Sequence, residues 1–138
     1  MAEVLATDVP VRLQTFLALD FGLKRTGVAV GNRLLRSAQG LPTIRAEGDA
    51  RFDQVRKRLG EWLPDALVVG VPFHTDGAAH ENTLRARKFA RALRGRFGLP
   101  VFEVDERYST TEALSAGAPD ADAGAACIIL EQFLRSIP

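Results

Sequence analysis

Carboxylates that follow predicted strands are the residues of this sequence best suited to chemistry. Asp20 ends the short apolar run Thr15–Asp20, and Gly22 comes directly after it. Ligands of α/β sheets collect at the carboxyl ends of strands, and a glycine there lets a ligand approach the backbone. Asp20 is therefore a candidate for binding a metal ion or a phosphate. An aspartate that caps a turn between two strands would give the same pattern.

A pair of adjacent acids, Asp105 and Glu106, ends another predicted strand, Val101–Asp105. Successive side chains of a strand point to opposite faces of the sheet, so at most one of the two acids can face the same site as Asp20. The spacing does not decide which one it is. An ion pair with Arg107 is the structural alternative for either acid.

A third carboxylate, Asp122, begins a predicted helix that runs from about residue 120 to 136. One stripe of this helix carries Asp122, Ala126, Ile129 and Phe133. Because that stripe must dock on the sheet, the carboxylate should point toward the protein, whereas Glu131 and Arg135 should point outward. A buried acid should be paired, cap the helix or bind a metal. A favourable interaction with the helix dipole is the alternative explanation.

Three carboxylates that converge from two strand ends and one helix suit divalent cations, which prefer hard oxygen ligands. Sites of this kind typically hold two ions ~4 Å apart and cleave phosphodiester bonds. Zinc is not expected, because His74 and His80 lie in one predicted loop and Cys127 is the only cysteine.

A basic helix supplies the complementary feature. The predicted helix Glu81–Phe97 has an apolar face, and its opposite arc carries Arg87, Lys88, Arg91 and Arg94. Residues 81–100 hold six basic and one acidic residue, whereas residues 101–138 hold two basic and seven acidic ones. Such an arc can follow a phosphate backbone, or it can be a solvated surface only. Beside an acidic metal site, we favour nucleic acid as the partner.

The elements that must position these residues alternate along the chain. Three short-linked antiparallel strands are predicted at Thr15–Asp20, Thr26–Asn32 and Leu34–Arg45, the last with a turn near Gly40-Leu41-Pro42. A helix with its apolar face on Phe52, Val55, Leu59 and Trp62 follows and ends at Pro64. Next come a buried central strand, Ala66–Val71, the basic helix, the strand before Glu106 and two further helices. This order predicts an α/β fold in which helices flank a mixed five-stranded sheet.

Length and composition set the class of protein. The 138 residues, 46% hydrophobic and 25% charged, fit a single globular domain, here residues 15–138. We expect residues 1–14 to be a disordered N-terminal extension. No run approaches the ~18 apolar residues of a membrane span, and no secretory signal is visible. A lone cysteine suggests a reducing compartment, so we expect a cytoplasmic protein without a membrane partner.

Four motifs, in this order, resemble the YqgF/RuvX family. They are Asp20–Ala29 (DFGLKRTGVA), Val69–Pro72 (VGVP) with Asp76-Gly77, Asp105–Thr110 (DERYST) and Asp122–Ala126 (DAGAA). The likeness spans about residues 15–134. It implies an RNase H-like fold and a relationship to the RuvC Holliday junction resolvases. Many members carry a longer basic loop where this chain has Leu114–Asp122, so the substrate contacts of that loop are not implied here.

The resemblance also implies roles for particular residues. It makes Asp20, Glu106 and Asp122 the catalytic carboxylates, with Mg²⁺ or Mn²⁺ as the cofactor, and it selects Glu106 over Asp105. Basic residues at family positions would be phosphate contacts, namely Lys24, Arg25 and Arg107.

Three functional hypotheses from different classes follow. The first is a divalent-metal-dependent endonuclease that acts on structured RNA or branched DNA, either in 5′-end processing of precursor 16S rRNA or in Holliday junction resolution. Junction cleavage would call for a homodimer with two active sites. The second is a non-catalytic nucleic-acid-binding or ribosome-assembly factor that kept the nuclease fold. The third, a nucleotide phosphotransferase of the actin-like group, needs two lobes, and this chain has room for one.

Overall fold

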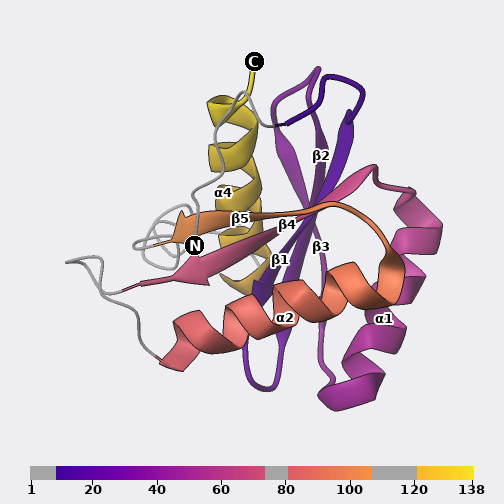
Figure 1. The fold of residues 1–138 in the computed structure, drawn as a ribbon, viewed down its shortest axis with the longest axis vertical. Coiled ribbons are helices and arrows are strands. Elements are labelled where there is room, and N and C mark those ends of the chain that lie inside the picture. Colours follow the sequence, from indigo (N-terminus) through magenta and orange to yellow (C-terminus); the bar gives the residue numbers. More distant parts are fainter. Residues whose placement is uncertain (1–8, 74–80, 107–120) are drawn as a thin grey trace.

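A mixed five-stranded sheet forms the centre of the molecule (Figure 1). The computed structural model describes residues 9–73, 81–106 and 121–138. Its strands are β1 (Thr15–Phe21), β2 (Thr26–Asn32), β3 (Ala38–Ile44), β4 (Ala66–Pro72) and β5 (Val101–Glu106). Their order is β3-β2-β1-β4-β5. The first three strands pair antiparallel, and β4 lies parallel to both β1 and β5. The expected mixed sheet is confirmed.

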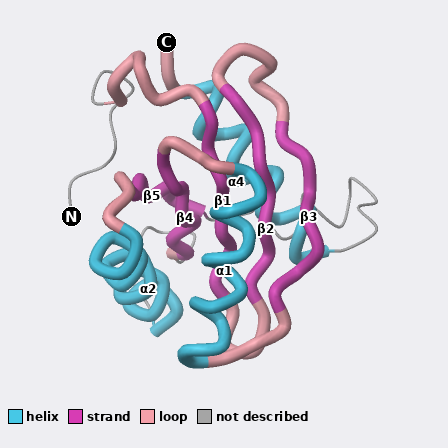
Figure 2. The backbone as a smooth tube through the Cα atoms, turned by 90° about the vertical axis from the view of Figure 1, so that its right-hand side faces the viewer, coloured by secondary structure: helices cyan, strands magenta, loops and turns pink. Residues whose placement is uncertain are grey.

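Helices cover both faces of this sheet (Figure 2). The described residues form α1 (Gly48–Trp62), α2 (Glu81–Phe97) and α4 (Ala121–Ser136). Side chains alternate along β1, so Phe16 and Ala18 pack with α4, whereas Leu17 and Leu19 pack with α1 and α2. The apolar core is therefore split into two layers by the sheet. A further helix was expected between residues 106 and 121 and falls outside the described residues.

The third strand differs from its prediction. Gly40, Leu41 and Pro42 do not form a turn but lie inside β3, where Gly40 and Leu41 pair with β2. The chain instead reverses between β2 and β3, and Arg36 there has a φ of 53°. Pro42 is tolerated because β3 is an edge strand. Gly40 suits the close passage of α4, because a Cβ at this position would lie 3.2 Å from the Cβ of Ala123.

Helix ends follow local signals in the sequence. The chain leaves α1 through Leu63, which adopts a left-handed conformation with a φ of 47°, and Pro64 comes next. It leaves α2 through Gly98, whose φ of 67° suits a glycine. The expected helix Glu81–Phe97 is confirmed with its bounds. No helix within the described ranges has the length and apolar character required to cross a membrane.

The residues before β1 join the fold. Val9 and Leu13 are buried in the core layer beneath α4. The guanidinium of Arg33 donates hydrogen bonds to the carbonyl oxygens of Pro10, Leu13 and Pro138, so it links this segment to the C-terminal end of the chain. Packing therefore begins within the stretch expected to be an extension, and residues 1–8 lie outside the described part.

Candidate active site

Asp20 lies near the end of β1, on the face of the sheet that α4 covers. It shares this face with Phe16 and Ala18 because side chains alternate along the strand. Burial raises the pKa of Asp20 from 3.8 to about 7, and the neighbouring charge of Asp122 adds to the rise. The carboxylate is therefore placed where a negative charge is poorly solvated, which is the setting that a bound cation would relieve.

Glu106 is the last residue of β5 and lies on the same face. It is only 8% exposed. The neighbouring strand leaves room for it at Gly70, since a Cβ there would collide with the Glu106 carboxylate and with Ile129 of α4. Burial raises the pKa of Glu106 from 4.5 to about 9, and repulsion from Asp20 contributes second. The two carboxylates thus interact across the ends of β1, β4 and β5.

Asp105 faces the opposite way. It belongs with Glu103 on the α2 side of β5, because Phe102 and Val104 pack on the α4 side. Of the two adjacent acids, the structure brings Glu106 to the face that carries Asp20. Sequence reasoning alone had left this choice open, and the resemblance had selected the same residue.

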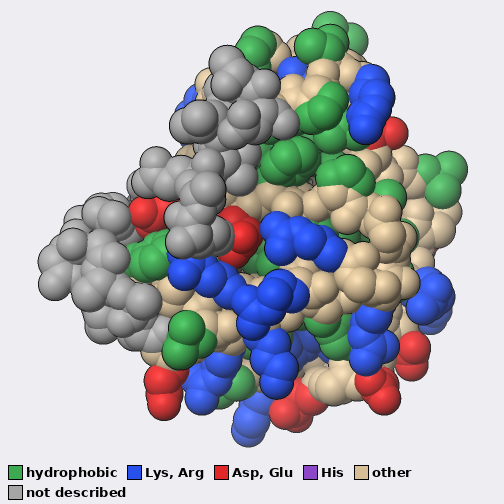
Figure 3. Space-filling view, viewed as in Figure 1, with side chains coloured by type: hydrophobic (Ala, Val, Ile, Leu, Met, Phe, Trp, Pro, Cys, Tyr) green, Lys and Arg blue, Asp and Glu red, His purple; other side chains and the backbone are tan. Residues whose placement is uncertain are grey.

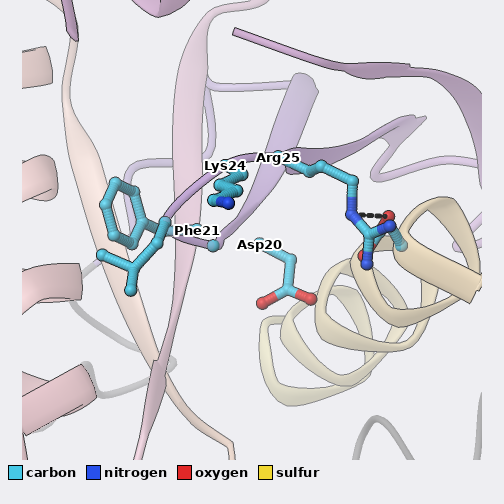
Figure 4. A pocket seen from close by; sticks show the side chains of 7 residues that line it. Asp20, Phe21, Lys24 and Arg25 are labelled. Atoms are coloured by element: carbon cyan, nitrogen blue, oxygen red, sulfur yellow. Dashed lines mark ion pairs between the residues drawn. The ribbon is translucent and has the colours of Figure 1, made fainter. Parts of the chain in front are cut away.

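Asp122 lies in the first turn of α4, as its position in the stripe predicted. The helix begins close to β2 because Gly27 has no side chain, and a Cβ at Gly27 would collide with the backbone carbonyl of Asp122. The Asp122 side chain is 28% exposed and forms an ion pair of 3.1 Å with Arg25 (Figure 4). The same stripe docks Ala126, Ile129 and Phe133 in the core. Arg135 is exposed as expected, whereas Glu131 is partly buried and accepts a hydrogen bond from the backbone of Ala38.

An open pocket of about 340 Å³ joins Asp20 to the turn between β1 and β2. Its lining consists of Asp20, Phe21, Gly22, Leu23, Lys24, Arg25 and Asp122 (Figure 4). Both basic residues are exposed, so two cationic side chains border a cavity whose other charged groups are carboxylates. The backbone N–H of Gly22 donates a 2.8 Å hydrogen bond to the Arg25 carbonyl, which closes the turn. Glu106 is not among the lining residues.

The donor set has the chemistry of a Mg²⁺ or Mn²⁺ site, because all three acids supply hard oxygen atoms from one face of the sheet. The charge of Asp122 raises the pKa of Asp20, and the charge of Asp20 raises the pKa of Glu106. In the described ranges, no three His, Cys, Asp or Glu side chains are already grouped so that they could hold one ion. The carboxylates match a divalent cation in donor type and in electrostatics, although they are not grouped around one point, and Arg25 provides the positive charge beside Asp122.

The four residues of the basic arc of α2 differ in their contacts. Arg87 and Arg94 form ion pairs of 3.7 and 3.6 Å with Glu103 of β5, and Arg94 also donates to the Val101 carbonyl. Lys88 and Arg91 are exposed, and Arg94 keeps 43% of its side chain exposed despite its ion pair. Lys and Arg side chains gather over α2 in the space-filling view (Figure 3). The sequence could not show this difference, because Glu103 lies on a separate strand.

Another residue of the site region was missed altogether. Arg51 of α1 is 4% exposed and contacts the turn between β1 and β2. A signal for it existed, since Arg51 precedes Val55 by one helical turn and so shares the buried face of α1. Arg107 and the two histidines, His74 and His80, lie outside the described residues.

Comparisons with known proteins agree on one family. The profile of the RuvX family, described as Holliday junction resolvase, matches residues 14–136. A protein of Albidiferax ferrireducens, named as a candidate pre-16S rRNA nuclease, is 79% identical over 129 residues, covering 94% of this chain and 83% of the relative. A Polaromonas protein of the same name is 71% identical over 126 residues, covering 91% of each chain.

Solved structures give a more distant likeness. RuvC of T. thermophilus, solved in complex with a Holliday junction substrate, superposes with a TM-score of 0.51 at 18% identity. The match covers 88% of this chain and 93% of that one. At this level of identity the likeness concerns the fold, and it agrees with the expected RNase H-like architecture.

Proposed function

The chain belongs to the RuvX family, and on this premise we propose that it is a divalent-metal-dependent endonuclease for structured nucleic acid, with precursor 16S rRNA as its substrate. The observation that carries the proposal is that Asp20, Glu106 and Asp122 lie on one face of the sheet, and that Asp20 and Asp122 line a pocket bordered by Lys24 and Arg25. The names of the similar proteins favour precursor rRNA over other substrates.

The carboxylates would hold the cation. A bound Mg²⁺ or Mn²⁺ would polarise the scissile phosphate and lower the pKa of the attacking water. Without it, burial raises the pKa of Glu106 to about 9, so this residue keeps its proton near neutral pH. Binding of a cation must therefore remove that proton, and metal affinity should rise with pH.

Basic residues would hold the substrate. Lys24 and Arg25 border the pocket and would contact the phosphates on either side of the scissile bond, whereas Lys88 and Arg91 of α2 are exposed and would follow the backbone farther away. Arg25 has a second task, because it pairs with Asp122 at 3.1 Å. Its side chain is 56% exposed, so this pair is weak and can give way to a phosphate and a cation.

A cleavage panel tests the proposal. A precursor 16S rRNA fragment, a four-way DNA junction, duplex DNA and single-stranded RNA are incubated with Mg²⁺, with Mn²⁺ or with EDTA. We expect cleavage of the precursor fragment that requires metal and that Asp20→Asn abolishes. Asp53→Asn, which removes an exposed acid of α1, is the matched control and should cleave normally.

A second candidate function, Holliday junction resolution, is favoured by the description of the family and by the likeness to RuvC. Metal-dependent cleavage of the junction with the rRNA fragment left intact would select it. Binding of either substrate without any cleavage, in every metal condition, would select the non-catalytic assembly factor and overturn the nuclease proposal.

A further inference from the structure

Arg51 is a buried cation whose role the carboxylate site does not explain. It lies in the first turn of α1 and is 4% exposed, although charged side chains are rarely buried without partners. Burial lowers the pKa of Arg51 from its ordinary value, the sign of an unfavourable setting for the charge. A residue kept in such a position must make contacts that compensate for the loss of water.

The contacts of Arg51 converge on the turn that borders the pocket. Nη2 donates a 2.6 Å hydrogen bond to the Leu23 carbonyl, and Nε donates one of 3.1 Å to the Ala46 carbonyl just before α1. The guanidinium also lies over the ring of Phe21, 4.3 Å from its centre. One side chain therefore connects α1 to the residue after Asp20 and to the residue before Lys24.

Apart from Arg51, the turn is held by the hydrogen bond from the Gly22 N–H to the Arg25 carbonyl and by the ion pair of Arg25 with Asp122. The Leu23 side chain is 57% exposed, and both basic residues that follow it are exposed as well. The Phe21 ring is held between Arg51 and the ring of Phe89 on α2, whose centre is 5.0 Å away. Arg51 reaches the turn from the α1 side of the sheet, opposite to the face that carries Asp20. Arg51 thus supports the turn from the face of the sheet opposite to the carboxylates.

We propose that Arg51 is a positioning residue that holds the Gly22–Arg25 turn so that Lys24 and Arg25 face the phosphates of the substrate. The inference rests on the proposed function, in which these two residues contact phosphate. Arginine suits the task because its planar fork bonds two carbonyl oxygens and stacks on a ring at once, and lysine cannot do both.

A double-mutant cycle tests the proposal. Dissociation constants are measured in EDTA, over a range of salt concentrations, for a double-stranded RNA stem from precursor 16S rRNA. The proteins are the wild type, Arg51→Gln, the pair Lys24→Gln with Arg25→Gln, and the triple variant. We expect Arg51→Gln to weaken binding on the order of tenfold and to flatten the salt dependence. In the triple variant, Arg51→Gln should add nothing, because the side chains that it positions are gone.

Arg56→Gln is the matched control, because it removes the same charge from the exposed side of the same helix. It should change affinity less than twofold. If Arg51→Gln behaves like this control while the pair at Lys24 and Arg25 weakens binding, the positioning role is wrong and the phosphate role stands. Equal losses from Arg51→Gln in both backgrounds also overturn it. If the pair itself has no effect, the phosphate role of the turn fails, and the proposal fails with it.

If Arg51→Gln does not fold, Arg51→Lys provides a second test of the positioning role. It retains the charge and most of the stem, so circular dichroism should show a native fold. We expect it to weaken RNA binding and to raise KM with little change in kcat, since the carboxylates on the other face are untouched. Full affinity in this variant would show that charge alone matters, which contradicts the positioning role.

Discussion

Glu103 and Glu106 are three positions apart on β5, yet their surroundings are opposite. Glu103 faces α2, where Arg87 and Arg94 form ion pairs with it. Glu106 faces the α4 side, and repulsion from Asp20 adds to the burial that raises its pKa to about 9. One glutamate is thus neutralised by arginines, and the other is held next to negative charge. That contrast separates a structural carboxylate from one available to a cation.

Two acids with raised pKa values should make the metal-free protein less stable as pH rises. The folded protein keeps the protons of Asp20 and Glu106 up to about pH 7 and pH 9, whereas the unfolded chain loses them near pH 4. The folded state therefore binds more protons in this interval, and the free energy of unfolding must fall with increasing pH.

Thermal melts in EDTA between about pH 5 and pH 9 should show a decreasing Tm for the wild type. Glu106→Gln should flatten this decrease, because the amide does not titrate. Mn²⁺ should restore stability at the alkaline end, since it binds only the folded state. A Tm that rises with pH in EDTA would contradict this account.

Substitution of single carboxylates should show which acids bind the divalent cation and which do not. We expect Asp20→Asn, Glu106→Gln and Asp122→Asn each to abolish cleavage and to reduce the Tm gain from Mn²⁺, because each removes an anionic oxygen ligand. Asp105→Asn is the control on the other face of β5 and should retain both. Loss of activity in Asp105→Asn with Glu106→Gln active would mean that the wrong face of the strand had been chosen.

At the scale of elements, the site exists because α4 begins directly against β2. Gly27 permits this approach, since any side chain there would collide with the backbone of Asp122. Gly70 on β4 leaves space for the Glu106 side chain of β5, because a Cβ at Gly70 would collide with the Glu106 carboxylate. Two glycines on the strands that flank β1 thus bring a helix start and a strand end to Asp20. The carboxylate positions depend on backbone packing as much as on the acids themselves.

Gly27→Ala should therefore damage the site through packing. The added methyl group forces the start of α4 away from β2, which should cost about 1–3 kcal/mol of stability and weaken the stabilisation by Mn²⁺. Gly60→Ala in α1 is the control, because nothing lies within 4 Å of a Cβ there. It should raise stability by about 0.5–1 kcal/mol, as alanine is favoured in a helix. Urea unfolding with and without Mn²⁺ measures both effects, and equal behaviour of the two variants would contradict the argument.

Much of this arrangement could be predicted from the sequence, and what could not has a physical cause. The strand end at Asp20 and the stripe of Asp122 depend on local periodicity, which a single segment contains. The turn expected at Gly40 was wrong because glycine and proline also occur in an edge strand beneath a helix. The choice between Asp105 and Glu106 depends on which face of β5 meets α4, and Arg51 depends on a contact with a turn 28 positions away. Contacts of this kind are set by tertiary packing.

At the scale of the whole molecule, the basic stretch 81–100 and the acidic stretch 101–138 meet where α2 packs on β5. The basic helix α2 packs on β4 and β5, and β5 carries acids on the same side. Arg87 and Arg94 form ion pairs in this contact, although the Arg94 side chain is still 43% exposed, and Lys88 and Arg91 are the other exposed basic side chains of the arc. Charge that is segregated along the chain is thus partly neutralised in the fold, and the surface available to a phosphate backbone is narrower than the sequence indicates.

Two pairs of variants on α2 should therefore behave differently. Lys88→Gln with Arg91→Gln removes exposed charges, so it should weaken nucleic-acid binding without changing the Tm. On duplex DNA the slope of log affinity against log salt should decrease by ~1.8, since each lost phosphate contact contributes ~0.9. Arg87→Gln with Arg94→Gln should instead lower stability by about 1–3 kcal/mol, because it leaves the 10%-exposed Glu103 carboxylate without its cationic partners.

Fluorescence anisotropy across a salt series and thermal melts on the same samples distinguish the two effects. A second substitution, Glu103→Gln, gives the internal control, because it should relieve the destabilisation of the Arg87 and Arg94 pair while leaving the salt slope unchanged. If instead the Arg87 and Arg94 pair flattens the slope and leaves the Tm unaltered, these arginines contact the nucleic acid directly. The ion pairs with Glu103 would then give way to phosphate when substrate binds, and the basic surface would extend from α2 across the edge of β5.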